Sequence, residues 1–381
     1  MKLNSIKYSE YQGHPKEWSL DEVRLGKKNL IVGRNSTGKT RTLNVIGSLA
    51  RTLSGVQTFI PPSGNYRCEW VNEVGVKYTY EYVVSEAKVR KEVLTIGGKI
   101  FMERGEGGRG TIFFEAIGDG LFVPFQTPEN EFALVKRRDA TQHSFIEPLY
   151  QWAAAVRHYN FGSSFGKEHL AVFTAAGPGI DEKDANQVVG IFRNGKRDFG
   201  PAFSKKITED MQYLGYSIES VDIGFPTTVP PEGLPPELQS LKVVEHGVVV
   251  EVDQLAMSQG MYRVLALLTH INYLQFRNAS TCILVDDIGE GIDFERSCKL
   301  IDLLRRKADE SDVQVIMSTN DKFVMNSVPL KEWTVLSRAG NHVHVNNYEN
   351  SKDKFDEFRF TGLSNFSFFE MDFLNDSDEV I

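Results

Sequence analysis

The chain has 381 residues, of which 41% are hydrophobic and 25% charged, and its net charge is −8. This is the composition of an ordinary soluble globular protein, with one large α/β domain or two domains. No apolar run approaches the roughly 18 residues that cross a bilayer, and the polar segment 1–11 argues against a secretory signal. Cys68, Cys282 and Cys298 are too few and too scattered for a disulfide framework or a metal site. We therefore expect a cytoplasmic protein without a membrane partner.

The first 60 residues contain a phosphate-binding motif. Residues 33–40 read Gly-Arg-Asn-Ser-Thr-Gly-Lys-Thr, which fits the pattern G-x-x-x-x-G-K-[ST]. The motif follows the apolar run 30–32 and precedes a predicted helix at 39–53, so it lies between a strand and a helix, as a phosphate loop requires. It predicts that the chain binds a nucleoside triphosphate with Mg²⁺.

Each position of this loop has a physical role. Gly33 and Gly38 let the backbone curl so that N–H groups point at a β-phosphate, and the start of the helix adds a partial positive charge. Lys39 can reach the β- and γ-phosphates, and the Thr40 hydroxyl can ligate Mg²⁺. Arg34 and Asn35 lie in the variable part of the loop, where we expect structural or partner-facing groups and no catalyst. The residues predicted to bind the nucleotide here are Gly33, Arg34, Asn35, Ser36, Thr37, Gly38, Lys39, Thr40 and Arg41.

The pattern along the chain divides it into four parts. Residues 1–180 form the N-terminal half of a core, with an antiparallel β-lobe inserted at about 66–125, where Gly97-Gly98 signals a hairpin turn. Residues 181–240 form a helical insertion and a Pro-rich connector, in which the chain must be extended. Residues 241–345 return to a strong α/β pattern and form the C-terminal half of the core. Residues 346–381 form an acidic tail.

Two acids follow an apolar run in the C-terminal half. The run 282–285 has four consecutive apolar residues, which suits a strand buried on both faces of a parallel sheet, and Asp286-Asp287 come directly after it. Asp286 is placed to order Mg²⁺, so the predicted metal ligands are Thr40 and Asp286. Asp287 could orient or deprotonate the attacking water.

Two further segments complete the candidate site. Ser258 is a good N-cap for a predicted helix at 264–274, and Gly260 permits close approach of a ligand to the backbone. A Ser-x-Gly at a helix N-terminus is a second anion site. Asn320 follows the predicted strand 313–317 and is the candidate for a polar group beside the γ-phosphate.

Together, the phosphate loop, the segment 257–263, the acids 286–287 and the segment 318–320 resemble the ABC-type ATPase core. The resemblance is to the RecF/SMC-like branch, where the loop reads G-x-N-x-[ST]-G-K-[ST] and the signature begins [LM]-S-x-G. Within that branch, the chain looks like the AAA-type ATPases found in OLD nucleases and bacterial anti-phage systems. The inserted β-lobe and the closing segment 360–366 look similar to that group as well.

The resemblance implies an α/β fold, a mixed or parallel sheet flanked by helices, that binds ATP and Mg²⁺. It also implies a homodimer, or a higher oligomer built from dimers, with two ATP molecules sandwiched between protomers. Lys39, Thr40 and the two acids would act from one subunit, and Ser258 and Gly260 would reach the γ-phosphate from the other. Loss of Lys39 would then abolish both association and hydrolysis.

Two departures from the family pattern favour a slow switch over a fast motor. Asp287 stands where the family usually has Glu, which is one methylene longer. Glu290 is therefore a second catalytic candidate, although the loop 290–293 is more typical of a dimer contact. Asn320 stands where the family often has His, so it can donate a hydrogen bond but cannot shuttle a proton at neutral pH. The predicted catalytic residues are Lys39, Asp287, Glu290 and Asn320.

We interpret the chain as a stand-alone switch ATPase, without a fused nuclease, that controls a separate effector in anti-phage defence. The segment beyond Asn320 shows no cluster of nuclease carboxylates, so a nuclease or toxin would be a separate partner. The alternative is a RecF-like ATPase that repairs or clamps DNA, and a scaffold that senses ATP without hydrolysing it also stays open.

The charge distribution gives DNA binding little support. The tail 346–381 carries nine acids and three bases, so the rest of the chain is nearly neutral and basic runs such as 136–138, 205–206 and 305–307 could still bind phosphates. The adenine-stacking residue, Trp18 or Tyr8, stays open, as does the lid glutamine, for which Gln142 is one possibility.

Overall fold

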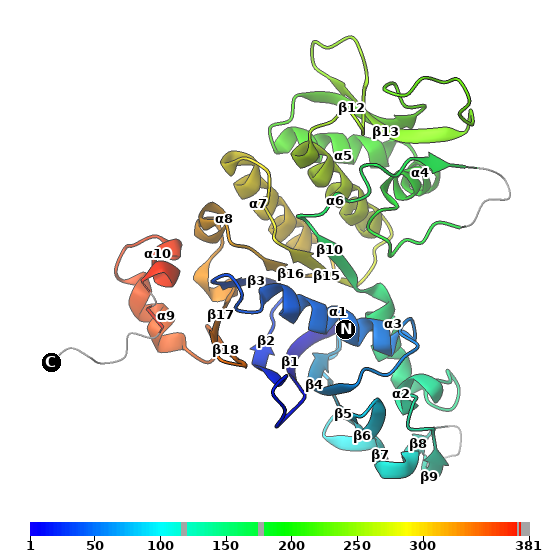
Figure 1. The fold of residues 1–381 in the computed structure, drawn as a ribbon, viewed down its shortest axis with the longest axis vertical. Coiled ribbons are helices and arrows are strands. Elements are labelled where there is room, and N and C mark those ends of the chain that lie inside the picture. Colours follow the sequence, from blue (N-terminus) through cyan, green and yellow to red (C-terminus); the bar gives the residue numbers. More distant parts are fainter. Residues whose placement is uncertain (116–119, 174–178, 372, 375–381) are drawn as a thin grey trace.

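The computed structural model describes residues 1–115, 120–173, 179–371 and 373–374. Its main feature is a mixed sheet of 14 strands, which runs from the middle of the molecule to its lower end in Figure 1. One end of this sheet is parallel, and its strands in spatial order are β10 (Arg157–Asn160), β15 (Thr281–Asp286), β16 (Val313–Ser318), β3 (Lys28–Gly33) and β17 (Trp333–Ala339). Every residue of β15 and β16 is buried, as expected for central strands covered on both faces.

The other end of the sheet is mostly antiparallel. From β17 it continues through β18 (His342–Asn347), β2 (Trp18–Arg24), β1 (Lys2–Glu10), β4 (Ser63–Val71), β5 (Lys77–Ser85), β6 (Lys88–Ile96), β7 (Lys99–Arg104), β8 (Arg109–Phe114) and β9 (Leu121–Gln126). The hairpin turn predicted at Gly97-Gly98 joins β6 and β7, with positive φ at both glycines. The antiparallel strands expected at 66–125 therefore extend the main sheet at one edge.

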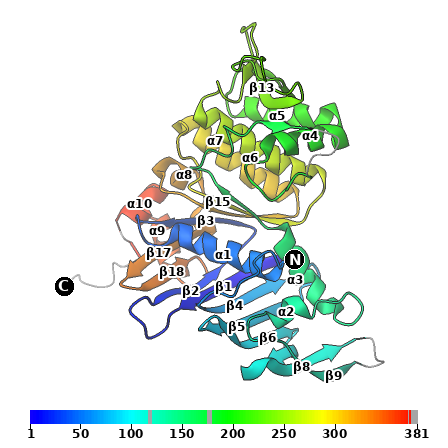
Figure 2. The same ribbon diagram turned by 45° about the vertical axis from the view of Figure 1, so that its right-hand side comes forward.

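Helices cover both faces of the parallel end, as Figure 2 shows. One face packs on α1 (Lys39–Leu53) and α3 (Glu147–Ala155), with the short α2 (Ala133–Lys136) nearby. The opposite face packs on α6 (Gln259–Phe276), α7 (Phe294–Glu310), α8 (Lys322–Ser327), α9 (Lys352–Arg359) and α10 (Asn365–Glu370). Phe368 of α10 is buried and Phe366 and Phe369 are partly buried against this second core, so these aromatic residues of the acidic tail pack on the protein itself.

The helical insertion packs on α6. It contains α4 (Val188–Phe199) and α5 (Pro201–Tyr213), and next to them lies a small sheet of β11 (Ala171–Val172), β13 (Leu238–Glu245), β12 (Ile218–Gly224) and β14 (Val252–Asp253). The Pro-rich segment was expected to be an extended connector. It instead bends repeatedly and forms a turn at 231–234, because it closes the antiparallel pair of β12 and β13.

The α/β fold class predicted from the sequence is therefore confirmed, including the antiparallel extension and the helical insertion. The division of the chain at residues 180, 240 and 345 stays a prediction. None of the helices in the described part of the chain has the length and apolar character that a membrane span needs.

Candidate nucleotide-binding site

The phosphate loop connects β3 to α1, and it is closed by hydrogen bonds among its own residues. The ammonium group of Lys39 is buried and donates to the carbonyl oxygens of Gly33 and Arg34, at 2.8 and 3.2 Å. The Thr37 hydroxyl donates to the same Arg34 carbonyl at 2.8 Å. These bonds hold the lysine beneath the loop, from where it can turn toward a bound phosphate.

The backbone of the loop fits an anion. Gly38 has φ +107°, a conformation that favours glycine, and it precedes the first turn of α1. The first N–H groups of a helix have no acceptor within the helix, so those at the start of α1 are available to a phosphate. A side chain at Gly33 would lie 2.4 Å from the Thr37 hydroxyl and 2.8 Å from the Leu336 carbonyl oxygen, so the tight curl requires glycine there.

The two acids lie where the sequence predicts them, at the carboxyl end of β15. Asp286 is buried, and the Ser318 hydroxyl donates to its carboxylate. The same hydroxyl accepts from the N–H of Asp287 at 3.0 Å, so Ser318 at the end of β16 fixes both acids. Asp287 has φ +52°, an unusual value for a residue with a side chain. The chain therefore turns sharply after the first carboxylate.

The charges of the site influence one another. Burial raises the pKa of Asp287, and the carboxylates of Asp286 and Glu290 raise it further, while Lys39 opposes them. Burial lowers the pKa of Lys39, and the two aspartates oppose that shift. The cation of the phosphate loop and the acids of β15 thus lie close enough to interact. Thr40 is exposed at the start of α1, so a hydroxyl and a carboxylate, the oxygen ligands that Mg²⁺ prefers, are both present.

Ser258 and Gly260 lie at the N-terminus of α6. Ser258 is exposed and caps the helix by accepting from the N–H of Met261 at 3.2 Å, as predicted. A side chain at Gly260 would lie 2.6 Å from the carbonyl oxygen of Gly291, so this helix end touches the loop after the acids.

Arg263 connects this helix end to two other segments, and sequence reasoning gave it no role. Its guanidinium donates to the carbonyl oxygens of Ser163 at 2.8 Å, Gly162 at 2.5 Å and Glu290 at 3.1 Å. Gly162 and Ser163 belong to the turn after β10, and Glu290 belongs to the turn after β15. A planar fork with five donors suits such a set of carbonyls. Its presence inside the segment 257–263 was the only sequence signal.

The remaining polar candidates lie at neighbouring strand ends. Asn320 is exposed after β16. Glu290 is also exposed, and its carboxylate lies beside Gly162. A side chain at Gly162 would lie only 2.3 Å from Glu290 Oε2. Asn160, which sequence reasoning missed, ends β10 directly opposite Asp286. Its place near the end of the segment 155–161, which has strand character, could have indicated it.

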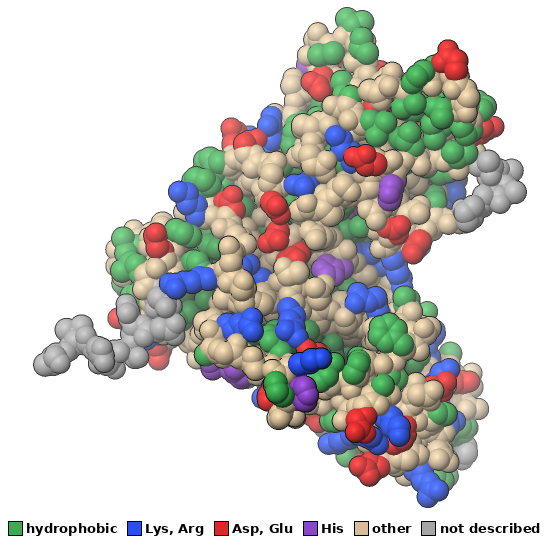
Figure 3. Space-filling model, viewed as in Figure 1, with side chains coloured by type: hydrophobic (Ala, Val, Ile, Leu, Met, Phe, Trp, Pro, Cys, Tyr) green, Lys and Arg blue, Asp and Glu red, His purple; other side chains and the backbone are tan. Residues whose placement is uncertain are grey.

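A cavity of about 330 Å³ borders the phosphate loop. Its walls are formed by Trp18, Asn35, Ser36, Gly38, Lys39, Thr40, Arg41, Asn320 and Arg338. Arg41 lies over the ring of Trp18 at 4.0 Å, and Arg338 donates to the Ser36 carbonyl at 3.3 Å. Figure 3 shows lysine and arginine side chains gathered over the region of β2, β3 and α1. Ser258 and Gly260 are not among the described residues that line this cavity.

The structure separates the three residues whose roles were left open. Trp18 lines the cavity, whereas Tyr8 is buried between the rings of Trp18 and Tyr66, at centroid distances of 5.8 and 4.5 Å. Gln142 lies in an exposed turn, where its N–H donates to Asp139 at 2.7 Å, and it does not line the cavity.

Comparison with known proteins shows similarity at the level of structure. No protein-family model matches the chain, and no curated protein matches its sequence. The chain is similar to the crystal structure of an Smc head bound to the C-winged helix domain of ScpA. That match has a TM-score of 0.56 and 13% identity, and it covers 93% of this chain and 100% of the other.

A second similar structure is the Smc head domain with an extended coiled coil, bound to the C-terminal domain of ScpA derived from Pyrococcus furiosus. Its TM-score is 0.53 with 13% identity, covering 94% of this chain and 100% of the other. The chain therefore has the fold of SMC head domains, which is an ABC-type ATPase fold.

Proposed function

We propose that this protein is an ATP-binding and slowly hydrolysing switch ATPase that closes into a homodimer around two nucleotides. The main observation behind this proposal is that Lys39, Asp286 and Asp287 lie close together at the carboxyl ends of β3 and β15. Ser258, in contrast, is exposed at the end of a separate helix. An exposed Ser-x-Gly helix terminus outside the cavity is available to complete the site of a second protomer.

The residues of the chain have distinct roles in this proposal. The loop backbone and Lys39 bind the phosphates, Trp18 borders the base-binding side, and Thr40 and Asp286 hold Mg²⁺, which neutralises charge on the phosphates. Asp287 orients the attacking water and accepts its proton. Its shorter side chain, compared with glutamate, and the absence of a proton-shuttling group at Asn320 favour slow turnover.

A mixing experiment tests the composite site. Lys39→Ala removes the phosphate ligand, and Ser258→Arg blocks the exposed helix end, so each variant alone should neither dimerise with Mg·ATP nor hydrolyse it. In an equal mixture only the heterodimer can form, and it keeps one intact site of two, which should restore up to about half of the wild-type rate in a two-fold dimer. Lys91→Ala, an exposed change on β6, is the control and should behave as wild type.

The outcomes of this experiment separate the possibilities. Dimerisation is measured by light scattering and hydrolysis by phosphate release. A mixture that stays inactive would contradict the composite site, and a Lys39→Ala variant that still dimerises on ATP would contradict ATP-driven closure. If wild type and Asp287→Asn hydrolysed ATP at equal, near-zero rates, the protein would be an ATP sensor without enzymatic activity.

We further propose that the switch controls a separate effector, a nuclease or toxin, in anti-phage defence. This part rests on the resemblance to the ATPases of such systems, and the two similar Smc heads, each bound to a ScpA domain, are precedents for a partner on this fold. Affinity purification from the host with and without ATP tests it. Recovery of a nuclease-like protein supports the proposal, and recovery of a membrane subunit would overturn it.

Acidic side chains lie beside the basic runs 136–138, 205–206 and 305–307, which disfavours the RecF-like, DNA-binding alternative. Lys136 pairs with Glu131 and Arg138 with Glu147, while Arg305 and Lys307 pair with Glu332 and Asp210. Lys205, Lys206 and Arg306 also have acidic partners within reach. Acidic neighbours reduce the net positive charge that these basic side chains present to a phosphate backbone. Salt-sensitive duplex binding, or hydrolysis stimulated by DNA, would restore that alternative.

A further inference from the structure

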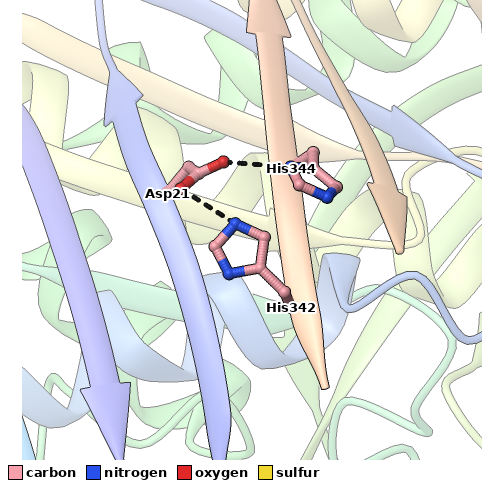
Figure 4. Close-up of side chains that lie close together, drawn as sticks. All are labelled: Asp21, His342 and His344. Atoms are coloured by element: carbon pink, nitrogen blue, oxygen red, sulfur yellow. Dashed lines mark ion pairs between the residues drawn. The ribbon is translucent and has the colours of Figure 1, made fainter. Parts of the chain in front are cut away.

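Two histidines and an aspartate lie together on the sheet, and none of them lines the cavity of the candidate nucleotide site. His342 and His344 are alternate residues of β18, so they project from the same face, and Asp21 lies on the neighbouring strand β2 (Figure 4). Within the described part of the chain, this is the one group of at least three His, Cys, Asp or Glu residues whose ligand atoms all lie within 4.8 Å of one another.

The atoms of this group are spaced as the ligands of a metal ion. The Nε2 atom of His342 lies 3.0 Å from Asp21 Oδ1, and the Nδ1 atom of His344 lies 3.4 Å from Asp21 Oδ2. Zinc binds imidazole nitrogen and carboxylate oxygen at about 2.0–2.2 Å, so tetrahedral ligand atoms are about 3.4 Å apart. Small side-chain rotations would therefore place an ion between the three residues.

A fourth residue supports one of the ligands. The Ser19 hydroxyl lies 2.6 Å from Nδ1 of His342. When Nδ1 carries the proton and donates it to Ser19, Nε2 presents its lone pair toward Asp21. Metal-binding histidines commonly have such a partner on the second ring nitrogen. An ordinary ion pair between Asp21 and a single histidine would require neither the second histidine nor this serine.

The position of the group suggests what a metal would do. In the register of the 14-stranded sheet, β18 pairs with β2 at only two positions, His342 with Ser19 and Val343 with Leu20. This narrow junction connects the parallel end of the sheet to the antiparallel end. The same two strands also border the candidate nucleotide site, because Trp18 of β2 lines its cavity and a side chain at Gly38 would lie 3.5 Å from Val343 of β18.

We propose that Asp21, His342 and His344 form a binding site for a divalent transition metal, with Zn²⁺ the ion that best fits two imidazoles and a carboxylate. The ion joins β2 to β18 across the narrow junction, and water completes its coordination, since all three side chains are partly exposed. This site is independent of the proposed ATPase activity.

Calorimetric titration of the metal-free, full-length protein with Zn²⁺, in excess Mg²⁺, tests the proposal. Wild type should bind one equivalent. Ser19→Ala should weaken binding by about tenfold, and Asp21→Asn, His342→Ala and His344→Ala, which each remove a ligand, should weaken it further. Asp21→Asn keeps the size of the side chain, so it tests the site even where a histidine variant folds poorly.

His246→Ala is the matched control. His246 is an exposed histidine 3.0 Å from a single carboxylate, that of Glu219, and its loss should leave Zn²⁺ affinity unchanged. Titration with Co²⁺ gives a second readout. We expect no thiolate charge-transfer absorption in the Co²⁺ spectrum, because none of the proposed ligands is a cysteine. Zn²⁺ should also raise the melting temperature of wild type and not that of Asp21→Asn. Equal Zn²⁺ affinity of wild type and Asp21→Asn would overturn the proposal.

Discussion

The contribution of the Ser318 hydroxyl to the free energy of unfolding can be worked out from its hydrogen bonds in the candidate site. It donates to the buried carboxylate of Asp286 and accepts from the N–H of Asp287 at 3.0 Å. In Ser318→Ala, both groups lose this partner. A hydrogen bond to a charged group contributes about 1.5–3 kcal/mol, and one to a neutral N–H about 1 kcal/mol. We therefore expect the free energy of unfolding to fall by about 3 kcal/mol in nucleotide-free protein.

The same change should impair hydrolysis, because Ser318 orients the proposed Mg²⁺ ligand. Loss of a residue that orients a metal ligand commonly costs about 10–100-fold in metal affinity or activity. Denaturation by urea, without nucleotide, and phosphate release under saturating Mg·ATP measure the two effects.

Ser327→Ala is the control for this prediction. The Ser327 hydroxyl donates to the neutral carbonyl of Val324 at 2.8 Å, away from the acids. Its removal should cost about 1 kcal/mol and leave hydrolysis unchanged. The reasoning would be refuted if Ser318→Ala were no less stable and no less active than Ser327→Ala.

Three further predictions concern the fold and the phosphate loop. The side chains of Glu92 and Arg104 are fully buried and 2.7 Å apart, so Glu92→Ala should destabilise the protein by about 3–5 kcal/mol in urea denaturation, whereas the exposed pair of Lys136 and Glu131 should contribute at most about 1 kcal/mol. Burial lowers the pKa of His270 to about 4, so the unfolded chain takes up the proton first on acidification. Stability should therefore fall by about 2 kcal/mol more between pH 7.5 and pH 5 in wild type than in His270→Gln. Gly33→Ala should abolish binding of a fluorescent ATP analogue while leaving the circular dichroism spectrum unchanged, because the added carbon would clash with the Leu336 carbonyl; an unchanged affinity would contradict the fit of the loop.

The elements that the sequence predicts correctly are those specified by neighbouring residues. The helix predicted at 39–53 is α1, the apolar run before Asp286 is a fully buried parallel strand, and Ser258 is the N-cap of α6. Each depends on a motif, a period or a cap within a few residues. Gly97-Gly98 forms the predicted turn for the same reason.

The features that the sequence did not reveal depend on contacts between distant segments. Arg263 binds the carbonyls of Gly162 and Ser163, about 100 residues earlier in the chain. The order of strands places β18 beside β2, which are more than 300 residues apart in sequence, and only that pairing brings His342 to Asp21. Neither spacing nor propensity carries information on such pairs, because strand order is decided by how whole layers pack.

The hydrogen bonds of Arg263 also bear on how nucleotide and partner could be coupled. One guanidinium holds the turn after β10, the turn after the acids and the helix end that carries Ser258. A shift of the turn at Glu290, which follows directly from the acids, cannot occur without either breaking a charge-assisted bond or moving this helix end. Since Ser258 is the group proposed to meet the nucleotide of the partner, the same three carbonyls connect the chemistry of one site to the contact surface of the other.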